Sequence, residues 1–193
     1  MDLDRFQLLY DWGVDNASLS RNPNLTPEQI DLLYTEKNGS RNRPNLARFS
    51  KLTNEQFMRF FNDKDFDKNY ITPNPHLTPE QIDLLYDAGV YKDSLALFPK
   101  LTEEQFMRFF NDEDFDKDNL ARNPNLTTEQ IDLLYQIEGV NKNLLALHPK
   151  LTDEQFLRAF NDGKTNKEYL AQNPSINAPA NQPFPSGVFN WKW

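Results

Sequence analysis

The sequence contains no cysteine, only two histidines and only six glycines among 193 residues. Without cysteine the chain can form no disulfide and carry out no thiol chemistry, which fits a reducing compartment. It has no glycine-rich phosphate-binding loop, no Gly-x-Ser-x-Gly motif and no His-Glu-x-x-His motif. We therefore expect a protein that is not an enzyme and that uses no cofactor.

Basic charge and long apolar runs are also scarce. The formal net charge is −8, whereas binding nucleic acid through its phosphates requires a high density of basic residues. No stretch approaches the roughly 20 apolar residues of a membrane-spanning helix. The first residues are charged and acidic, whereas a signal peptide begins with a basic and then an apolar segment. We expect no direct nucleic-acid contact, no membrane association, and a location in the cytoplasm of a bacterium or of a bacterial host cell.

The sequence does contain a repeat. The motif Leu-Thr-x-Glu-Gln begins six times, at intervals of 27, 25, 24, 25 and 25 residues, and a decayed copy begins at Ile176. Residues 1–24 align without a gap on residues 77–100, so one more unit precedes the first motif. A fixed period of this length indicates a solenoid. The six motifs begin at Leu25, Leu52, Leu77, Leu101, Leu126 and Leu151.

Each motif predicts the start of a helix. The threonine occupies the N-cap position and a glutamine follows three residues later, as in Thr102 and Gln105, which is the pattern of a capping box. Pro27 and Pro79 fall at the first helical position, where proline is favoured. Counted from the threonine, apolar residues recur at the fourth, seventh and eighth places, which form one helix face. We expect that face to be the core.

A second, shorter helix is predicted before each motif, because an apolar residue and a small residue are followed by a proline that ends the segment. The long helix alternates between Ile-Asp-Leu-Leu-Tyr and Phe-Met-Arg-Phe-Phe, so a larger period of about 50 residues overlies the short one. The sequence therefore predicts an all-α fold: a right-handed α-solenoid of about seven two-helix repeats of about 25 residues each, with a broken eighth.

The repeat resembles a known group. Asn-Pro-x-Leu-Thr-x-Glu-Gln followed by an apolar helix is similar to the variant leucine-rich repeats and short HEAT-like repeats of bacterial and bacteriophage proteins, and the resemblance covers residues 1 to about 176. It implies an α-solenoid and leaves the function open, because such arrays resemble one another whatever they bind. Some variant leucine-rich-repeat proteins carry a cysteine-ligated iron–sulfur cluster, which a chain without cysteine does not have.

We divide the chain into a repeat domain, residues 1–176, and a proline-rich linker with an aromatic C-terminal tail, residues 177–193. Phe189, Trp191 and Trp193 carry too much apolar surface to stay in water, so the tail is expected to cap its own last repeat or to dock on another chain. The first repeat lacks a polar cap and is expected to be adhesive around Trp12. Two additional residues near 37–41 predict a protruding loop. Either a monomer or a dimer through the uncapped ends is consistent with these features.

Metal sites are not expected. Residues 112–118 have carboxylates at every second place, as in the first half of a calcium loop, but Lys117 stands where such a loop needs glycine. Asx turns and a helix N-cap explain these carboxylates better. His76 and His148 are far apart and have no cysteine or second histidine at ligand spacing.

The sixth place of the long helix points away from the core at about 100° per residue. Glutamates four residues before its arginines favour helix-stabilising pairs, whereas its leucines are explained either by burial or by an apolar contact stripe. With the aromatic tail, these outward residues are our candidate partner-binding set. Down the chain this place is occupied by Leu8, Leu32, Arg59, Leu84, Arg108, Leu133 and Arg158.

We expect the protein to bind another protein. The resemblance favours a bacteriophage protein that inhibits a bacterial protein, such as one involved in defence. One alternative is a structural protein that self-associates through its ends, and another is an acidic DNA mimic that inhibits a nucleic-acid-binding protein. Acidic clusters recur only every second unit, roughly 20 Å apart if stacked helices lie about 10 Å from each other. That spacing is much coarser than the spacing of phosphates, which counts against the mimic.

Overall fold

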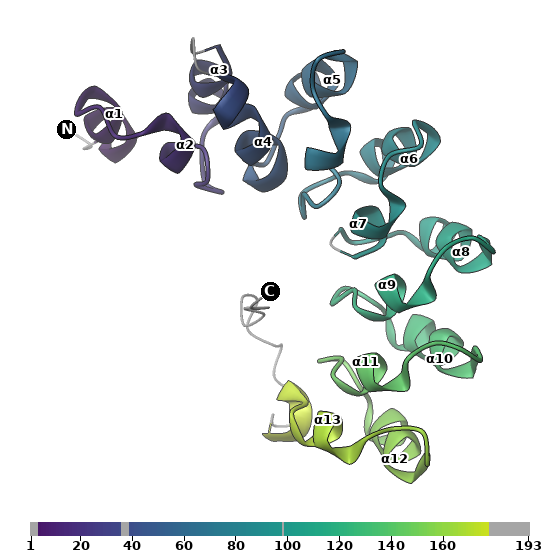
Figure 1. Ribbon diagram of the computed structural model, residues 1–193. Coiled ribbons are helices and arrows are strands. Elements are labelled where there is room, and N and C mark those ends of the chain that lie inside the picture. The colour runs from purple at the N-terminus through teal and green to yellow at the C-terminus, as the bar shows by residue number, and fades with distance from the viewer. Residues whose placement is uncertain (1–3, 36–38, 98, 178–193) are drawn as a thin grey trace. The chain divides into compact units, whose positions relative to one another are not determined.

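The computed structural model describes residues 4–35, 39–97 and 99–177. In these residues it contains thirteen α-helices, two short 3-10 helices and no strand (Figure 1). The expectation of an all-α protein is confirmed. No helix in this part of the chain is long and apolar enough to cross a membrane.

The chain divides into two compact units, residues 1–115 and residues 116–193. The division falls inside the fifth repeat, after its long helix, at a position that the sequence pattern does not mark. We describe each unit by itself. The predicted boundary at residue 176 lies at the end of the described residues and stays a prediction.

The long helices begin where the motif predicts. In each of the six motifs the threonine hydroxyl accepts a hydrogen bond from the glutamine N–H, and the glutamine side chain accepts one from the threonine N–H. The predicted capping boxes are confirmed. The long helices are α1 (Arg5–Asp11), α3 (Pro27–Thr35), α5 (Asn54–Asn62), α6 (Pro79–Asp87), α8 (Glu103–Asn111), α10 (Thr128–Gln136) and α12 (Asp153–Asn161).

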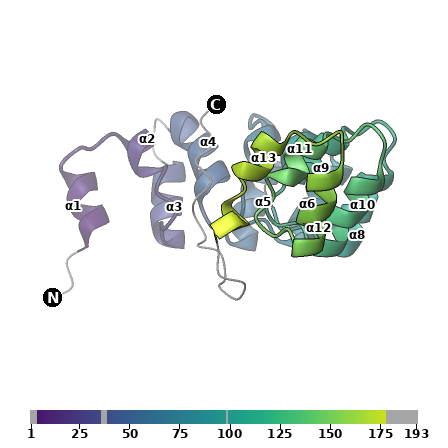
Figure 2. The same cartoon turned by 90° about the horizontal axis from the view of Figure 1, so that it is seen from below.

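A second helical segment follows each long helix, and in every repeat except the second it is shorter than the long helix, as expected. Most of these segments are single turns, because an Asx-type cap starts them and a following proline ends them. They are α2 (Asn16–Leu19), α4 (Gly39–Phe49), η1 (Lys68–Tyr70), α7 (Lys92–Leu97), α9 (Lys117–Ala121), α11 (Lys142–Ala146) and α13 (Lys167–Ala171), with η2 (Pro174–Asn177) after the last. In Figures 1 and 2 long and short helices alternate along each unit.

The core lies on the predicted face of the long helices. Side chains at the fourth and seventh places, such as Phe57 and Phe60, are fully buried. The eighth place lies at the edge of the core, because Phe61 and Tyr86 there are only half-buried. At the C-terminal end of the described residues, Ala146, Ala159 and Leu170 form a small buried cluster.

The predicted loop at residues 37–41 is wrong in its second half. Gly39, Ser40 and Arg41 are part of α4, which is the longest helical segment with 11 residues, while residues 36–38 lie outside the described part. The additional residues therefore lengthen a helix. The buried amide of Asn42 fixes this part of α4 to α3, because it donates a hydrogen bond to the Leu33 carbonyl at 3.1 Å.

Candidate protein-binding surface

The outward leucines differ in exposure. Leu8 is 53% and Leu84 is 40% exposed, while Leu32 and Leu133 are half-buried. The predicted stripe is therefore apolar at its surface in α1 and α6, and in α3 and α10 it is partly covered. Phe189, Trp191 and Trp193, the other apolar members of the predicted set, lie outside the described residues.

The outward arginines do not use the expected partners. Arg59 donates to Asp31 and Arg158 donates to Asp132, each on the long helix of the preceding repeat. Arg108 reaches Asp87 in the same way, with Asp83 at 3.8 Å. The sequence instead suggested glutamates four residues earlier on the same helix. The long arginine side chain reaches the neighbouring helix, because that helix offers its guanidinium both a carboxylate and an aromatic ring.

That ring belongs to a tyrosine at the eighth place. The Arg59 guanidinium lies 4.1 Å and the Arg108 guanidinium 3.7 Å from the ring centres of Tyr34 and Tyr86, and Arg158 lies 4.4 Å from that of Tyr135. A cation over an aromatic face at this distance is attracted by the ring quadrupole. The second cation on each ring comes from the following short helix: Arg43 at 4.4 Å, Lys92 at 4.7 Å and Lys142 at 5.0 Å.

Each tyrosine hydroxyl donates to the aspartate that ends the next long helix. The distances are 3.4 Å from Tyr34 to Asp63, 2.9 Å from Tyr86 to Asp112 and 2.6 Å from Tyr135 to Asp162. The same aspartates form the predicted Asx turns with the amide two residues later. Tyrosine, arginine and carboxylates thus link two consecutive repeats through side chains about 25 residues apart in sequence.

Several carboxylates of this linkage have a pKa below the ordinary value. The Lys92 ammonium and the Tyr86 hydroxyl lower the pKa of Asp112, and the Tyr135 hydroxyl lowers that of Asp162. Partial burial raises the pKa of Asp31, but hydrogen bonds from Arg59 and Gln56 outweigh it and bring the pKa below its ordinary value. These aspartates therefore hold neighbouring repeats together at neutral pH.

A buried glutamine completes each linkage. The Gln105 amide donates to the Pro79 carbonyl at 2.6 Å and to Asp83 at 3.0 Å while its oxygen caps α8. Gln56 and Gln155 make the corresponding bonds to the preceding repeat. We call a repeat with Ile-Asp-Leu-Leu-Tyr a leucine-type repeat and one with Phe-x-Arg-x-Phe a phenylalanine-type repeat. The linkage joins a leucine-type repeat to the phenylalanine-type repeat that follows it.

The sequence carries a signal for this linkage. The aspartate of Ile-Asp-Leu-Leu-Tyr and the arginine of the next long helix recur together in three consecutive pairs: Asp31 with Arg59, Asp83 with Arg108 and Asp132 with Arg158. Opposite charges that alternate between adjacent units indicate contact between units. The arginines of the predicted set therefore mainly hold neighbouring repeats together, and only the solvent-exposed part of each side chain is available to a partner.

Histidine and acidic residues show no ligand cluster. The described residues contain no group of three or more His, Cys, Asp or Glu that could hold a metal ion. His148 is buried, its Nε2 lies 3.1 Å from the Asn123 carbonyl, and its Nδ1 accepts from the Lys150 N–H at 3.2 Å. Burial lowers the pKa of His148 to about 4, so the ring is neutral at pH 7.

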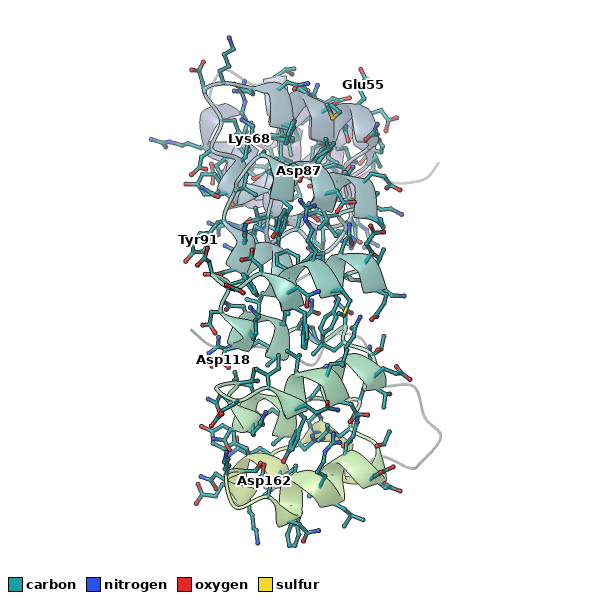
Figure 3. All side chains as sticks on the ribbon, turned by 90° about the vertical axis from the view of Figure 1, so that its right-hand side faces the viewer. Glu55, Lys68, Asp87, Tyr91, Asp118 and Asp162 are labelled. Carbon is teal, nitrogen blue, oxygen red and sulfur yellow. The ribbon has the colours of Figure 1, made fainter. Side chains whose placement is uncertain are left out.

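Figure 3 looks onto the long helices and shows the two edges of this surface in the first unit. Glu55 lies at the N-terminal end of α5, and Lys68 and Tyr91 lie at the opposite edge, where the long helices pass into the short ones. An open groove of about 610 Å³ runs along this second edge beside Tyr91.

Comparisons of the chain with protein-family models, with curated proteins and with solved structures found no match. The resemblance to variant leucine-rich and HEAT-like repeats therefore stays an expectation from the sequence motif alone.

Proposed function

We propose that this chain is a non-enzymatic protein-binding module, built as a right-handed α-solenoid of about seven repeats. The recurrence of one set of polar contacts at an offset of about 25 residues supports the repeat architecture. Capping boxes occupy the same place in consecutive units, and arginine–aspartate pairs and tyrosine–aspartate bonds recur at every second junction between units. A surface held by so many fixed contacts presents its exposed side chains with little loss of conformational entropy on binding.

The observation that carries the proposal is Leu84. Leu84 is 40% exposed at the centre of α6, whereas its neighbour Leu85 is completely buried. The helix α6 is held in place, because it is capped at its start and is hydrogen-bonded to the next repeat near both ends. The exposed Leu84 side chain lies between Asp83 and Asp87, which both pair with Arg108. A protein contact site typically has this layout, with an apolar centre and a polar rim. The partner is another protein, and it is contacted neither through nucleic acid nor through a membrane.

The resemblance to bacteriophage and bacterial repeat proteins supports a bacterial protein as the partner, met in the cytoplasm. It also supports inhibition of that protein as the outcome. The net charge of −8 favours a partner with a basic contact surface, because opposite potentials steer association.

The experiment is retention of proteins from a bacterial lysate on the immobilised full-length chain, followed by mass spectrometry. The proposal predicts one host protein in stoichiometric amount that is lost from Leu84→Glu but retained by Tyr91→Glu, since Tyr91 is an exposed aromatic residue away from Leu84. Retention that is equal for both variants would place the contact elsewhere. Retention of the chain itself as the only protein would support the self-associating alternative.

A further inference from the structure

The last complete repeat exposes apolar residues whose counterparts are covered. Leu157 on α12 is 57% exposed and Phe160 is 45% exposed. Their counterparts on α5, Met58 and Phe61, are half-buried, and α6 follows next to α5 in Figures 1 and 2. Phe156 is half-buried, whereas its counterpart Phe57 is completely buried. The comparison of equivalent residues shows that the apolar face of α12 is more exposed than the same face of α5.

The chain leaves this repeat with the same geometry as at the interior junctions. The Asn173 amide donates to the Ala146 and His148 carbonyls at 2.6 and 3.0 Å, as Asn74 does to Ala47 and Ser50 at 2.7 and 2.9 Å. The Ile176 N–H then donates to the Asn173 carbonyl at 3.1 Å, as Leu77 does to Asn74 at 3.5 Å.

At the interior junctions this geometry delivers the next long helix onto the previous one. Leu77, at the start of that helix, is buried, whereas Ile176 is exposed. By this analogy the chain is delivered at Asn177 toward the uncovered face of α12, and the sequence that follows has prolines at positions 179, 183 and 185, a residue type that disfavours a helix interior.

We infer that residues 184–193 dock on this uncovered face, formed by Leu157, Phe160 and Ile176, and cap the array within the same molecule. The docking segment carries Phe184, Phe189, Trp191 and Trp193 and no acidic side chain. Burial of each large aromatic side chain stabilises by roughly 1.5 to 3 kcal/mol. The inference concerns the end of the array and does not rest on the proposed partner binding.

Reach and tethering favour the chain's own tail over a second copy. Sixteen residues beyond Asn177 extend to about 50 Å, while a nine-residue helix such as α12 is only about 14 Å long. A tethered segment has an effective concentration on the order of millimolar, far above the micromolar concentrations at which a second molecule competes.

The test uses tryptophan fluorescence of the full chain. Trp12, Trp191 and Trp193 are the three tryptophans, so Trp12→Phe leaves only the tail to report. In this variant we expect collisional quenching by acrylamide to be several-fold weaker than in a synthetic peptide of residues 178–193. We also expect emission at shorter wavelength, a monomer by light scattering, and no dependence of the emission on concentration.

Two face variants in the Trp12→Phe background test the docking site, and a third serves as the control. Leu157→Lys and Phe160→Lys should each raise quenching towards that of the peptide, and Leu157 is so exposed that its replacement leaves the fold intact. Leu84→Lys, an equally apolar position on α6, should leave the quenching unchanged. Quenching as strong as in the peptide before any face mutation would overturn the inference, and so would shielding that appears only as the protein dimerises.

Discussion

His148 shows how one buried side chain makes the stability of this protein depend on pH. The ring is buried with its Nε2 at the Asn123 carbonyl, and Lys150 is the charged group beside it. Burial holds its pKa at about 4 in the folded chain, against about 6.5 in an unfolded one. Between these values the unfolded chain binds the additional proton, so stability falls as the pH is lowered through this range.

We predict that this histidine costs the folded state about 2 kcal/mol between pH 7.5 and pH 5, from the two pKa values and the linkage relation. His148→Phe removes the titration, and phenylalanine already stands at the matching place in Phe49. Denaturant unfolding of both proteins at the two pH values measures the difference. Because the aspartates titrate in both proteins, their effect cancels. An identical pH dependence in the two proteins would show that His148 is not buried as a neutral ring.

Side chains that act within one turn could be predicted from the sequence, and side chains that act between repeats could not. The threonine–glutamine caps depend only on residues three apart, which the sequence displays directly. Arg59 has Glu55 one turn before it and Asp31 in the preceding repeat, and sequence spacing favours the first. The structure selects Asp31 because Tyr34 lies beside it and binds the guanidinium on its face.

At the scale of helices, the two repeat types divide the work. The capping glutamine Gln105, in a phenylalanine-type repeat, also reaches the preceding repeat, while Gln81, within the described residues, makes only the capping bonds with Thr78. Consecutive leucine-type and phenylalanine-type repeats are thus joined by polar contacts. The period of about 50 residues in the sequence is the period of this pairing.

This division predicts unequal losses for one substitution at matched places. Gln81→Ala removes a cap and should lower the free energy of unfolding by about 1 kcal/mol. Gln105→Ala removes the same cap and two further bonds worth roughly 0.5 to 1.5 kcal/mol each, so about 2 to 4 kcal/mol is expected. Both side chains are buried to the same degree. Equal losses in thermal or denaturant unfolding would contradict a special role for Gln105 between repeats.

Helix starts, the core face and the short second helix followed from local patterns, and the structure has them. The local patterns wrongly predicted a protruding loop, because the two additional residues lengthen α4 around the buried Asn42 instead. Insertions have this freedom whenever a short helix can grow by part of a turn. Exposure of the outward leucines also escaped prediction, since it depends on how neighbouring helices lean over Leu32 and Leu133.

At the scale of the whole molecule, many polar side chains on the long helices hold neighbouring repeats together. Aspartates, arginines and tyrosines on the outer side of the long helices pair with one another. The surface that remains for a partner is a small apolar area with Leu84 at its centre. The acidic residues in the first turns of the long helices, such as Glu80 on α6, then act on the rate and selectivity of association more than on its strength.

We propose that a protein partner binds the outer side of the long helices at Leu84. Calorimetric titration of the purified partner into wild type, Leu84→Glu and Tyr91→Glu tests it most directly, with circular dichroism showing that all three are equally helical. The account predicts a loss of at least tenfold in affinity for Leu84→Glu, because truncating or charging a central apolar contact costs about 2 kcal/mol or more. Tyr91→Glu should bind as the wild type does. Unchanged affinity in Leu84→Glu, or a loss in Tyr91→Glu alone, would contradict the claim and move the contact to the loop edge.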